Sequence, residues 1–282
     1  MWVLALLLAG GISLAQGETD IYLISVEPQS DSLQLGIPEN ITRNPGYDNQ
    51  PAFTPEGKLL YSRTRDGQTD IAAYDPGTAA TEWITDTPGG SEYSPLPIPG
   101  SKDYSAIRLD TNGLQRLYRY KNGKPKLLVP DQKIGYQVWV NPELLVCTVL
   151  VEGGMDLVVI GPAGGSVYTF QKNVGRSLQR IPGSDRISFV ALESGEAVLQ
   201  SMDPVSGATS AITPLPEGVQ DVVWLSGTTL LCGKGNQIMR WDAEEEAGWR
   251  PVYRMPQDTG DISRMALSPE GNLLALVIAP ER

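Results

Sequence analysis

Residues 41–46 read ITRNPG, and residues 84–89 repeat them as ITDTPG, 43 residues further along the chain. A looser copy, ITPLPEG, follows at residues 212–218, close to three more periods away. A second motif behaves in the same way, because FTPEGKLL at 53–60 returns as LSPEGNLL at 267–274. A repeat of about 40–45 residues that is rich in short apolar runs and turn residues is typical of four-stranded propeller blades.

Six turns follow this period along the chain. They centre on Pro55, Pro99-Gly100, Asn141-Pro142, Pro182-Gly183, Ser226-Gly227 and Pro269, with steps of 40–44 residues between them. Each turn separates two β-rich runs, which is the pattern of the hairpin that opens a blade. No apolar helical period persists over 11 residues beyond residue 15. The sequence therefore predicts an all-β fold, a six-bladed β-propeller of four-stranded blades.

The last blade is expected to be closed by both ends of the chain. Only two strands follow the Pro269 turn, whereas residues 20–26 (DIYLISV) have the pattern of a third strand and residues 39–42 (ENIT) that of a fourth. Pairing the two sets would cover two otherwise exposed strand edges without a covalent bond.

The first 15 residues carry no charge. They contain the apolar run WVLALLLA at 2–9 and end in the small residues of SLA at 13–15. This pattern predicts a signal peptide over residues 1–15, cleaved before Gln16, and a single propeller domain over residues 16–282 in the periplasm or outside the cell. The apolar run is shorter than the ~20 residues of a membrane-spanning helix, so no membrane span is expected after cleavage.

Composition narrows the possible functions. The net charge is −11, so the chain lacks the basic surface of a nucleic-acid-binding protein. The absence of histidine excludes Ser-His-Asp and Cys-His nucleophiles and histidine-ligated metals. Cys147 and Cys232 fall in the second strands of blades three and five, too far apart for a disulfide, so two buried free thiols are expected. No catalytic residue, metal or cofactor is predicted.

Two further features are expected to have structural roles. Trp139 and Trp224 stand on innermost strands, where large side chains fill the space between blades. Residues 242–246 (DAEEE) follow a third strand and are expected to form a solvated loop. A basic partner or a metal ion on that loop is the alternative.

The candidate binding site is the mouth of the channel. The segments that lead into the six innermost strands surround this mouth on one face. Tyrosines, amides and charged groups in these segments suit an extended chain or a sugar, held by stacking and hydrogen bonds. The candidate ligand-binding residues are Tyr47, Asp48, Glu92, Tyr93, Tyr136, Gln137, Arg176, Gln220 and Asp261.

The repeat resembles the TolB-type, WD-repeat-like propeller family. PAFTPEGKLLYS at 51–62, TDI at 69–71 and IT at 84–85 are similar to the family pattern Pro-x-aromatic-Ser-Pro-Asp-Gly-Lys, a β-branched strand, Asp-Ile-Tyr and a closing Ile-Thr. LSPEG at 267–271 and TDIY at 19–22 match the same pattern, and both copies of the turn carry Glu where the family prefers Asp. The resemblance covers about residues 19–282 and implies a six-bladed propeller.

The resemblance implies binding rather than catalysis. TolB is a periplasmic protein whose propeller mouth receives a segment of an envelope lipoprotein, although its additional N-terminal α/β domain is not expected here. Oligogalacturonate lyases share the propeller, but their chemistry is associated with histidine. The first hypothesis is therefore a monomeric, non-catalytic module that binds a cell-envelope protein or a glycan at the mouth.

The alternative is a carbohydrate-active enzyme, a lyase or hydrolase that acts through carboxylates in the funnel. Asp48, Glu92 and Asp261 are its candidate residues, since each is expected to stand just ahead of an innermost strand. Paired carboxylates can hydrolyse glycosides without histidine. Clustering of the three in a deep pocket favours the enzyme, whereas an open funnel with these carboxylates apart favours the binding module.

Overall fold

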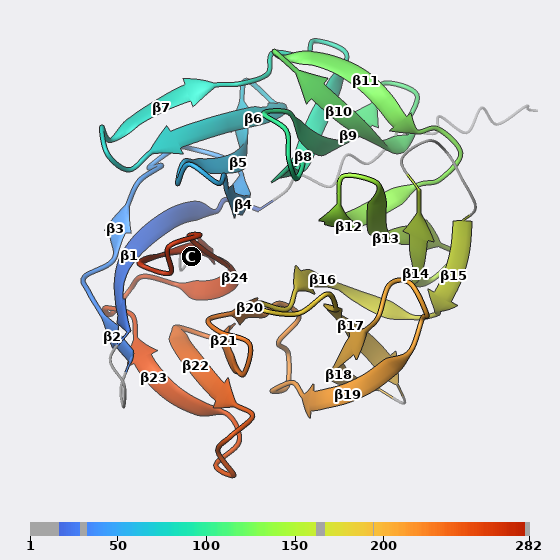
Figure 1. Cartoon of the computed structure of the whole chain (residues 1–282). Coiled ribbons are helices and arrows are strands. Elements are labelled where there is room, and N and C mark those ends of the chain that lie inside the picture. Colours follow the sequence, from blue (N-terminus) through green and yellow to red (C-terminus); the bar gives the residue numbers. More distant parts are fainter. Residues whose placement is uncertain (1–16, 29–32, 162–166, 194, 280–282) are drawn as a thin grey trace, which may run out of the picture.

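The computed structural model describes residues 17–28, 33–161, 167–193 and 195–279. Within these ranges the chain forms 25 strands in six antiparallel sheets, arranged as blades around a common axis (Figure 1). This arrangement confirms the predicted six-bladed propeller. The signal peptide predicted for residues 1–15 lies outside the described residues. No helix among the described residues is long and apolar enough to cross a membrane.

Blades 1 to 3 are each formed by four consecutive strands, the first of which lies nearest the axis (Figure 1). Blade 1 contains β4 (Asp48–Phe53), β5 (Leu59–Arg65), β6 (Gln68–Asp75) and β7 (Ala80–Trp83). Blade 2 contains β8 (Gly90–Pro97), β9 (Tyr104–Asp110), β10 (Gln115–Lys121) and β11 (Lys124–Val129). Blade 3 contains β12 (Ile134–Asn141), β13 (Leu144–Val151), β14 (Gly154–Ile160) and β15 (Val167–Gln171).

Blades 4 and 5 follow the same plan. Blade 4 contains β16 (Val174–Arg180), β17 (Ile187–Glu193), β18 (Glu196–Met202) and β19 (Thr209–Pro214). Blade 5 contains β20 (Val223–Trp224), β21 (Thr229–Lys234), β22 (Gln237–Asp242) and β23 (Arg250–Arg254).

Blade 6 joins the two ends of the chain, as predicted. Its inner strands are β24 (Asp261–Leu267) and β25 (Leu273–Ala279), and β1 (Asp20–Pro28) pairs with β25. The register places Asp20 opposite Ile278 and Ser25 opposite Leu273. The outer edge of β1 is covered by two short strands, β3 (Glu39–Asn40), which was expected, and β2 (Leu33–Leu35), which was not.

Apolar side chains from both faces of each sheet fill the space between neighbouring blades. Trp139 and Trp224 are buried there, as predicted, and each also makes a polar contact with the preceding blade. The indole Nε1 of Trp139 donates to Ser105 Oγ at 2.8 Å, and that of Trp224 donates to Ser188 Oγ at 2.9 Å. These hydrogen bonds satisfy the only polar group of a large buried ring, and they tie consecutive blades together.

The two cysteines confirm the prediction of separate thiols. Cys147 lies in β13 and Cys232 in β21, and both are free and buried. Burial raises the pKa of both thiols, that of Cys232 to about 12. The thiolate form is therefore disfavoured, and neither sulfur is a reactive nucleophile at neutral pH.

β-Bulges interrupt the innermost strands near the mouth. The register of β4 shifts between Asn49 and Ala52, and that of β8 shifts between Tyr93 and Leu96. Inside these bulges Gln50 and Ser94 have φ angles of 56° and 49°. A bulge bends the strand and re-aims its side chains. The innermost strands therefore do not follow a simple alternation of inward and outward side chains where they approach the mouth.

Candidate functional site at the channel mouth

Six side chains, one from each blade, form a ring at the mouth. We call this set the channel ring. In blade order its members are Tyr47, Tyr93, Tyr136, Arg176, Asp221 and Arg264. Four of them line a hollow of about 90 Å³ between the innermost strands, namely Tyr136, Arg176, Asp221 and Arg264. The ring is the place where all six repeats contribute to one surface.

The charged part of the ring comes from blades 4, 5 and 6. Arg176 Nε lies 2.5 Å from Asp221 Oδ2, and Arg176 Nη2 donates to the carbonyl of Ser263 at 2.8 Å. Arg264 Nη1 is 3.8 Å from the same Asp221 oxygen. Arg264 Nη2 donates to the hydroxyl of Tyr136 at 3.2 Å, and the guanidinium carbon lies 5.2 Å from the centre of that ring. Two guanidinium groups thus share one carboxylate.

The tyrosines form the other part of the ring. The rings of Tyr47 and Tyr93 meet edge to face with their centres 6.3 Å apart. Burial raises the pKa of Tyr47 to about 12, although the Arg264 guanidinium acts to lower it. The Tyr47 phenol therefore stays neutral at physiological pH. It offers an apolar face and a hydroxyl rather than a charge.

Amide side chains tie blades 1, 2 and 3 together beneath the tyrosines. Gln50 Oε1 accepts hydrogen bonds from the Ser94 backbone N–H at 2.8 Å and from Ser62 Oγ at 2.9 Å. Gln137 Nε2 donates to the Ser94 carbonyl at 3.0 Å, and Gln137 Oε1 accepts from Ser105 Oγ at 2.8 Å. Gln137 thus lies in the channel wall with its amide committed to the neighbouring blade. These bonds set the spacing of the innermost strands.

Two of the candidate carboxylates lie between blades instead of in the channel. Asp48 and Glu92 are both 0% exposed. Glu92 accepts hydrogen bonds from Thr85 Oγ1 at 2.8 Å and from the Tyr120 hydroxyl at 2.9 Å. Both oxygens of Asp48 lack a hydrogen-bond partner among the described residues, and Arg63 Nε is 3.8 Å away. Burial raises the pKa of each carboxyl to about 7.

The remaining candidates line a second hollow, which adjoins the ring at Arg176 and Asp221. Gln220 and Asp261 are exposed and line a hollow of about 270 Å³ beside blades 5 and 6, together with Lys234. Asp48, Glu92 and Asp261 therefore occupy three separate places and do not converge on one pocket. No group of three or more cysteine, aspartate and glutamate residues in the described chain is arranged to hold a metal ion.

An exposed apolar surface adjoins the ring on one side, and the sequence analysis missed it. It comes from the ends of the second strands of blades 2, 3 and 4, and we call it the apolar arc. Its members are Leu109, Leu150, Val151 and Leu192. The register places these strand ends beside the start of each innermost strand, at the mouth. The signal in the sequence was the apolar run LLVCTVLV at 144–151, which continues up to the turn at 152–153.

A further hollow of about 320 Å³ leads outward from the ring, between blades 3 and 4. It is lined by Tyr136 and Arg176 of the ring, by Leu192 of the arc, and by Met155 and Ala197. At the strand ends that correspond to the arc, blade 1 carries Arg65 and blade 5 carries Lys234. At these strand ends blades 2 to 4 therefore carry an exposed leucine or valine, although blade 2 also places the Arg108–Asp110–Arg116 ion pairs there.

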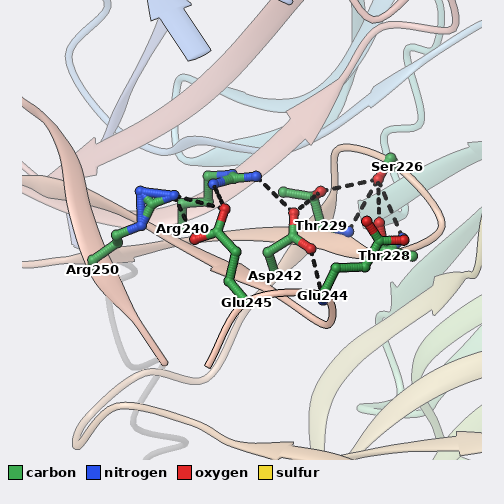
Figure 2. Close-up of polar contacts among 8 residues, drawn as sticks. All are labelled: Ser226, Thr228, Thr229, Arg240, Asp242, Glu244, Glu245 and Arg250. Carbon is green, nitrogen blue, oxygen red and sulfur yellow. Dashed lines mark hydrogen bonds and ion pairs between the residues drawn. The ribbon is translucent and has the colours of Figure 1, made fainter. Parts of the chain in front are cut away.

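The loop at residues 242–246 lies at the opposite face from the ring, because Asp242 pairs with Thr229 at the start of β21, whereas Lys234 ends β21 at the mouth. Figure 2 shows how its charges are paired. Asp242 Oδ2 accepts from Thr229 Oγ1 and from Arg240 Nη2, both at 2.7 Å. Glu245 contacts Arg240 and Arg250. Two carboxylates of this loop are thus neutralised within blade 5, while Glu244 and Glu246 are exposed.

Solved structures share this fold at low sequence identity. A protein assigned as TolB from Agrobacterium tumefaciens superposes with a TM-score of 0.70 at 12% identity, over 95% of this chain and 100% of that one. TolB from Acinetobacter baumannii gives a TM-score of 0.60 at 16% identity, over 93% of this chain and 64% of that one. At this identity the similarity establishes the TolB-like propeller fold and nothing more.

An enzyme also shares the fold. Oligogalacturonate lyase from Vibrio parahaemolyticus superposes with a TM-score of 0.60 at 10% identity, over 95% of this chain and 99% of that one. No protein-family model matches the chain, and no curated protein matches it in sequence. The solved propellers with this fold therefore include proteins of different function.

Proposed function

We propose that this protein is a non-catalytic binding module that holds an extended segment of a partner protein at its channel mouth. The observation that carries the proposal is the channel ring, to which every blade gives one side chain, with the apolar arc beside it. Tyrosine and arginine, which make up five of the six ring members, are enriched in protein–protein interfaces and among the residues that contribute most to binding. The likeness to TolB and the predicted signal peptide favour a location in the periplasm or outside the cell.

A protein segment suits this mouth better than a glycan does. Leu150, Val151 and Leu192 offer aliphatic surface and no side-chain hydrogen bonds for sugar hydroxyls. The hollow of about 320 Å³ between blades 3 and 4 is large enough for one or two apolar side chains. A peptide whose backbone crosses the ring can place such side chains there, as extended peptides do in other recognition grooves.

The positions of the carboxylates support a binding role. An enzyme that cleaves a glycosidic bond with two carboxylates needs them on either side of the substrate, about 5–10 Å apart and open to it. Asp48 and Glu92 are instead closed off between blades, so neither can flank a substrate together with Asp261, which lines the hollow beside blades 5 and 6. A lyase that acts through the funnel remains the second candidate, favoured by the fold shared with oligogalacturonate lyase. Release of unsaturated products from oligogalacturonate would establish that activity.

The binding proposal is tested by capture and mutation. Envelope extract is passed over the immobilised protein, the retained partner is identified, and the affinity of its binding segment is measured. Joint replacement of Tyr47, Tyr93 and Tyr136 by alanine should reduce affinity at least about 100-fold, because each buried aromatic contact contributes on the order of 1 kcal/mol or more. The melting temperature should change little.

A second variant tests the apolar arc. Leu150→Glu should weaken binding about tenfold or more, because it places a charge on the apolar surface. Val205→Glu is the matched control, since Val205 is an exposed apolar residue on the opposite face, in the turn after β18. Undiminished binding by the triple tyrosine variant, with loss on changing the 242–246 loop, would show that the partner uses the other face.

A further inference from the structure

The charges in the channel ring do not balance. Arg176 and Asp221 form a close pair, while Arg264 stays 3.8 Å from the same carboxylate oxygen. The side chains of Arg264 and Asp221 are each 14% exposed, and that of Arg176 is 25% exposed. One guanidinium charge is therefore left without a counterion in a confined space, within a protein whose net charge is −11.

A partly buried guanidinium group that lacks a counterion of its own is energetically unfavourable. A mostly desolvated cation whose nearest anion is already paired with another cation costs free energy relative to water, and an arginine on a surface normally avoids this by extending into solvent. Arg264 does not do so. The Tyr136 ring and hydroxyl hold its guanidinium, and β24 carries a register shift between Ile262 and Arg264 that aims the side chain at the axis.

Arg264 also has N–H groups that could bind a ligand. Its guanidinium has five N–H groups, and its hydrogen bond to another described residue is the one to the Tyr136 hydroxyl. The group lines the hollow of about 90 Å³ between the innermost strands. An anion placed in this hollow would receive two parallel N–H groups, the arrangement in which arginine binds carboxylates most strongly.

We propose that Arg264, supported by Arg176, binds a carboxylate of the partner segment inside the channel ring. This inference rests on the proposed function, since it names the chemistry of the segment held there. The surplus is a single positive charge, and Asp221 repels a second negative charge, so a monoanion fits better than a phosphate dianion. The carboxylate is that of an aspartate or glutamate side chain or of the C-terminus, while neighbouring apolar side chains contact the apolar arc.

Two random peptide libraries test the proposal on the whole protein. One displays peptides with a free C-terminus and the other displays them internally, so the two sources of carboxylate are separated. Both are selected in parallel on wild-type protein and on Arg264→Met, with Arg254→Met as the control. Arg254 is also an arginine, but it lies exposed on β23. Thermal unfolding establishes that each variant is folded, and Arg264→Lys, which keeps the charge, is selected as well.

The wild type and Arg254→Met should select peptides with an acidic residue at one position, or with a free terminus, next to apolar residues. Arg264→Met should keep the apolar preference and lose the acidic one, and Arg264→Lys should retain part of it. In the best peptide, replacing Glu by Gln, or amidating the terminus, should weaken binding to wild type about 10- to 100-fold and to Arg264→Met less than about twofold.

Three results would overturn the inference in distinguishable ways. Selection of acid-free peptides by wild type removes the carboxylate site but leaves the proposed function intact. Binding of glucuronate or polygalacturonate that depends on Arg264, with no peptide selected, assigns the site to a sugar acid and contradicts both proposals. Peptide selection that survives the triple tyrosine variant unchanged places binding elsewhere on the molecule.

Discussion

The two junctions on either side of blade 1 are built from the same sequence motif. Thr42 closes the junction between blades 6 and 1, and Thr85 closes the one between blades 1 and 2. In each, the threonine hydroxyl accepts a hydrogen bond from the backbone N–H of the isoleucine after an aspartate, Ile21 at 3.0 Å and Ile71 at 2.8 Å. The repeated Asp-Ile and Ile-Thr pairs are therefore one structural unit, which anchors the end of a blade.

The junctions differ in the acid that follows. Glu92 is one methylene longer than Asp48, and it accepts hydrogen bonds from Thr85 and Tyr120. At the other junction Thr42 donates to Asp20 instead, at 3.1 Å, and Asp48 is left with Arg63 Nε at 3.8 Å. Burial raises the pKa of both acids to about 7. The two carboxyl groups are thus equally buried, but Glu92 has hydrogen-bond partners and Asp48 has none among the described residues. The junctions differ because the longer side chain of Glu92 reaches its hydrogen-bond donors, and not because one carboxyl group is more buried than the other.

The largest effect is expected at the satisfied junction. Glu92→Ala leaves the hydroxyls of Thr85 and Tyr120 without an acceptor and opens a cavity, so the free energy of unfolding should fall by about 2–4 kcal/mol. Urea denaturation at pH 6 measures it. Glu92→Gln, which keeps the shape and an acceptor oxygen, should lose about 1 kcal/mol or less. Equal losses for the two variants would mean that side-chain shape and a single acceptor oxygen cannot replace the carboxyl group.

At the other junction, removing the acid should raise the free energy of unfolding, and the size of this gain should depend on pH. The pKa of Asp48 is about 7 in the folded protein, well above its ordinary value, so between about pH 4 and 7 the folded state holds a proton that the unfolded state has lost. Stability therefore falls as pH rises through this window. Asp48→Asn should raise the free energy of unfolding by about 1–3 kcal/mol at pH 8 and by almost nothing at pH 4.

Urea denaturation at pH 4, 6 and 8 measures this difference. Asp131→Asn, at an exposed position, is the control and should show no such pH-dependent gain. A gain from Asp48→Asn that is equal at all three pH values would contradict the raised pKa.

Replacing the junction threonines, Thr42 and Thr85, should lower the free energy of unfolding by more similar amounts. Thr85→Val should cost about 1–2 kcal/mol, because it removes the partner of both the Ile71 N–H and Glu92. Thr42→Val should cost somewhat less, since Asp20 keeps its hydrogen bond from Asn40 at 2.8 Å. Thermal unfolding at pH 6 compares the two variants side by side. A larger loss for Thr42→Val would reverse the ranking of the junctions.

The smallest effect is expected for Tyr120→Phe. The variant removes one donor to Glu92 and leaves the ring stacked on Tyr104, with centres 5.4 Å apart. The loss should be about 0.5–1.5 kcal/mol, and larger at pH 8 than at pH 5, because the hydroxyl stabilises the ionised carboxylate more than the neutral acid. Urea denaturation at the two pH values measures it. A loss independent of pH would mean that Glu92 stays protonated throughout.

The blades were predictable because their turns carry local chemistry. The turn at 53–60 and its copy at 267–274 each open a hairpin, and the Asp-Ile strand at residue 20 was assigned to blade 6 from the same repeat. These signals act within a few residues of the chain. The strand β2 escaped prediction because its three residues pair with the far end of β1 and belong to no repeat.

The candidate site was predictable only in part. Tyr47, Tyr93, Tyr136 and Arg176 lie in the channel ring, as expected for mouth segments, but their ligand-binding role stays a prediction. Adjacent residues of a strand point to opposite sides, so one of Tyr47 and Asp48 had to turn away from the channel.

In β24 a register shift between Ile262 and Arg264 sets which residues face the channel, and such a shift cannot be placed from the sequence. Arg264 was therefore missed altogether, and Asp221 was passed over in favour of its neighbour Gln220. Both ring members became recognisable only when segments from blades 4, 5 and 6 were brought together in space.

The seam in blade 6 has a consequence for how the protein is made. β1 leaves the ribosome early and β25 late, yet Asp20 pairs with Ile278 across that seam. Contacts between segments so distant in the chain form only after a large loss of chain entropy, and they fold slowly. The ring therefore closes after synthesis of the propeller is nearly complete. Until then the ring stays open at blade 6, and the other five blades lack the support of a closed circle.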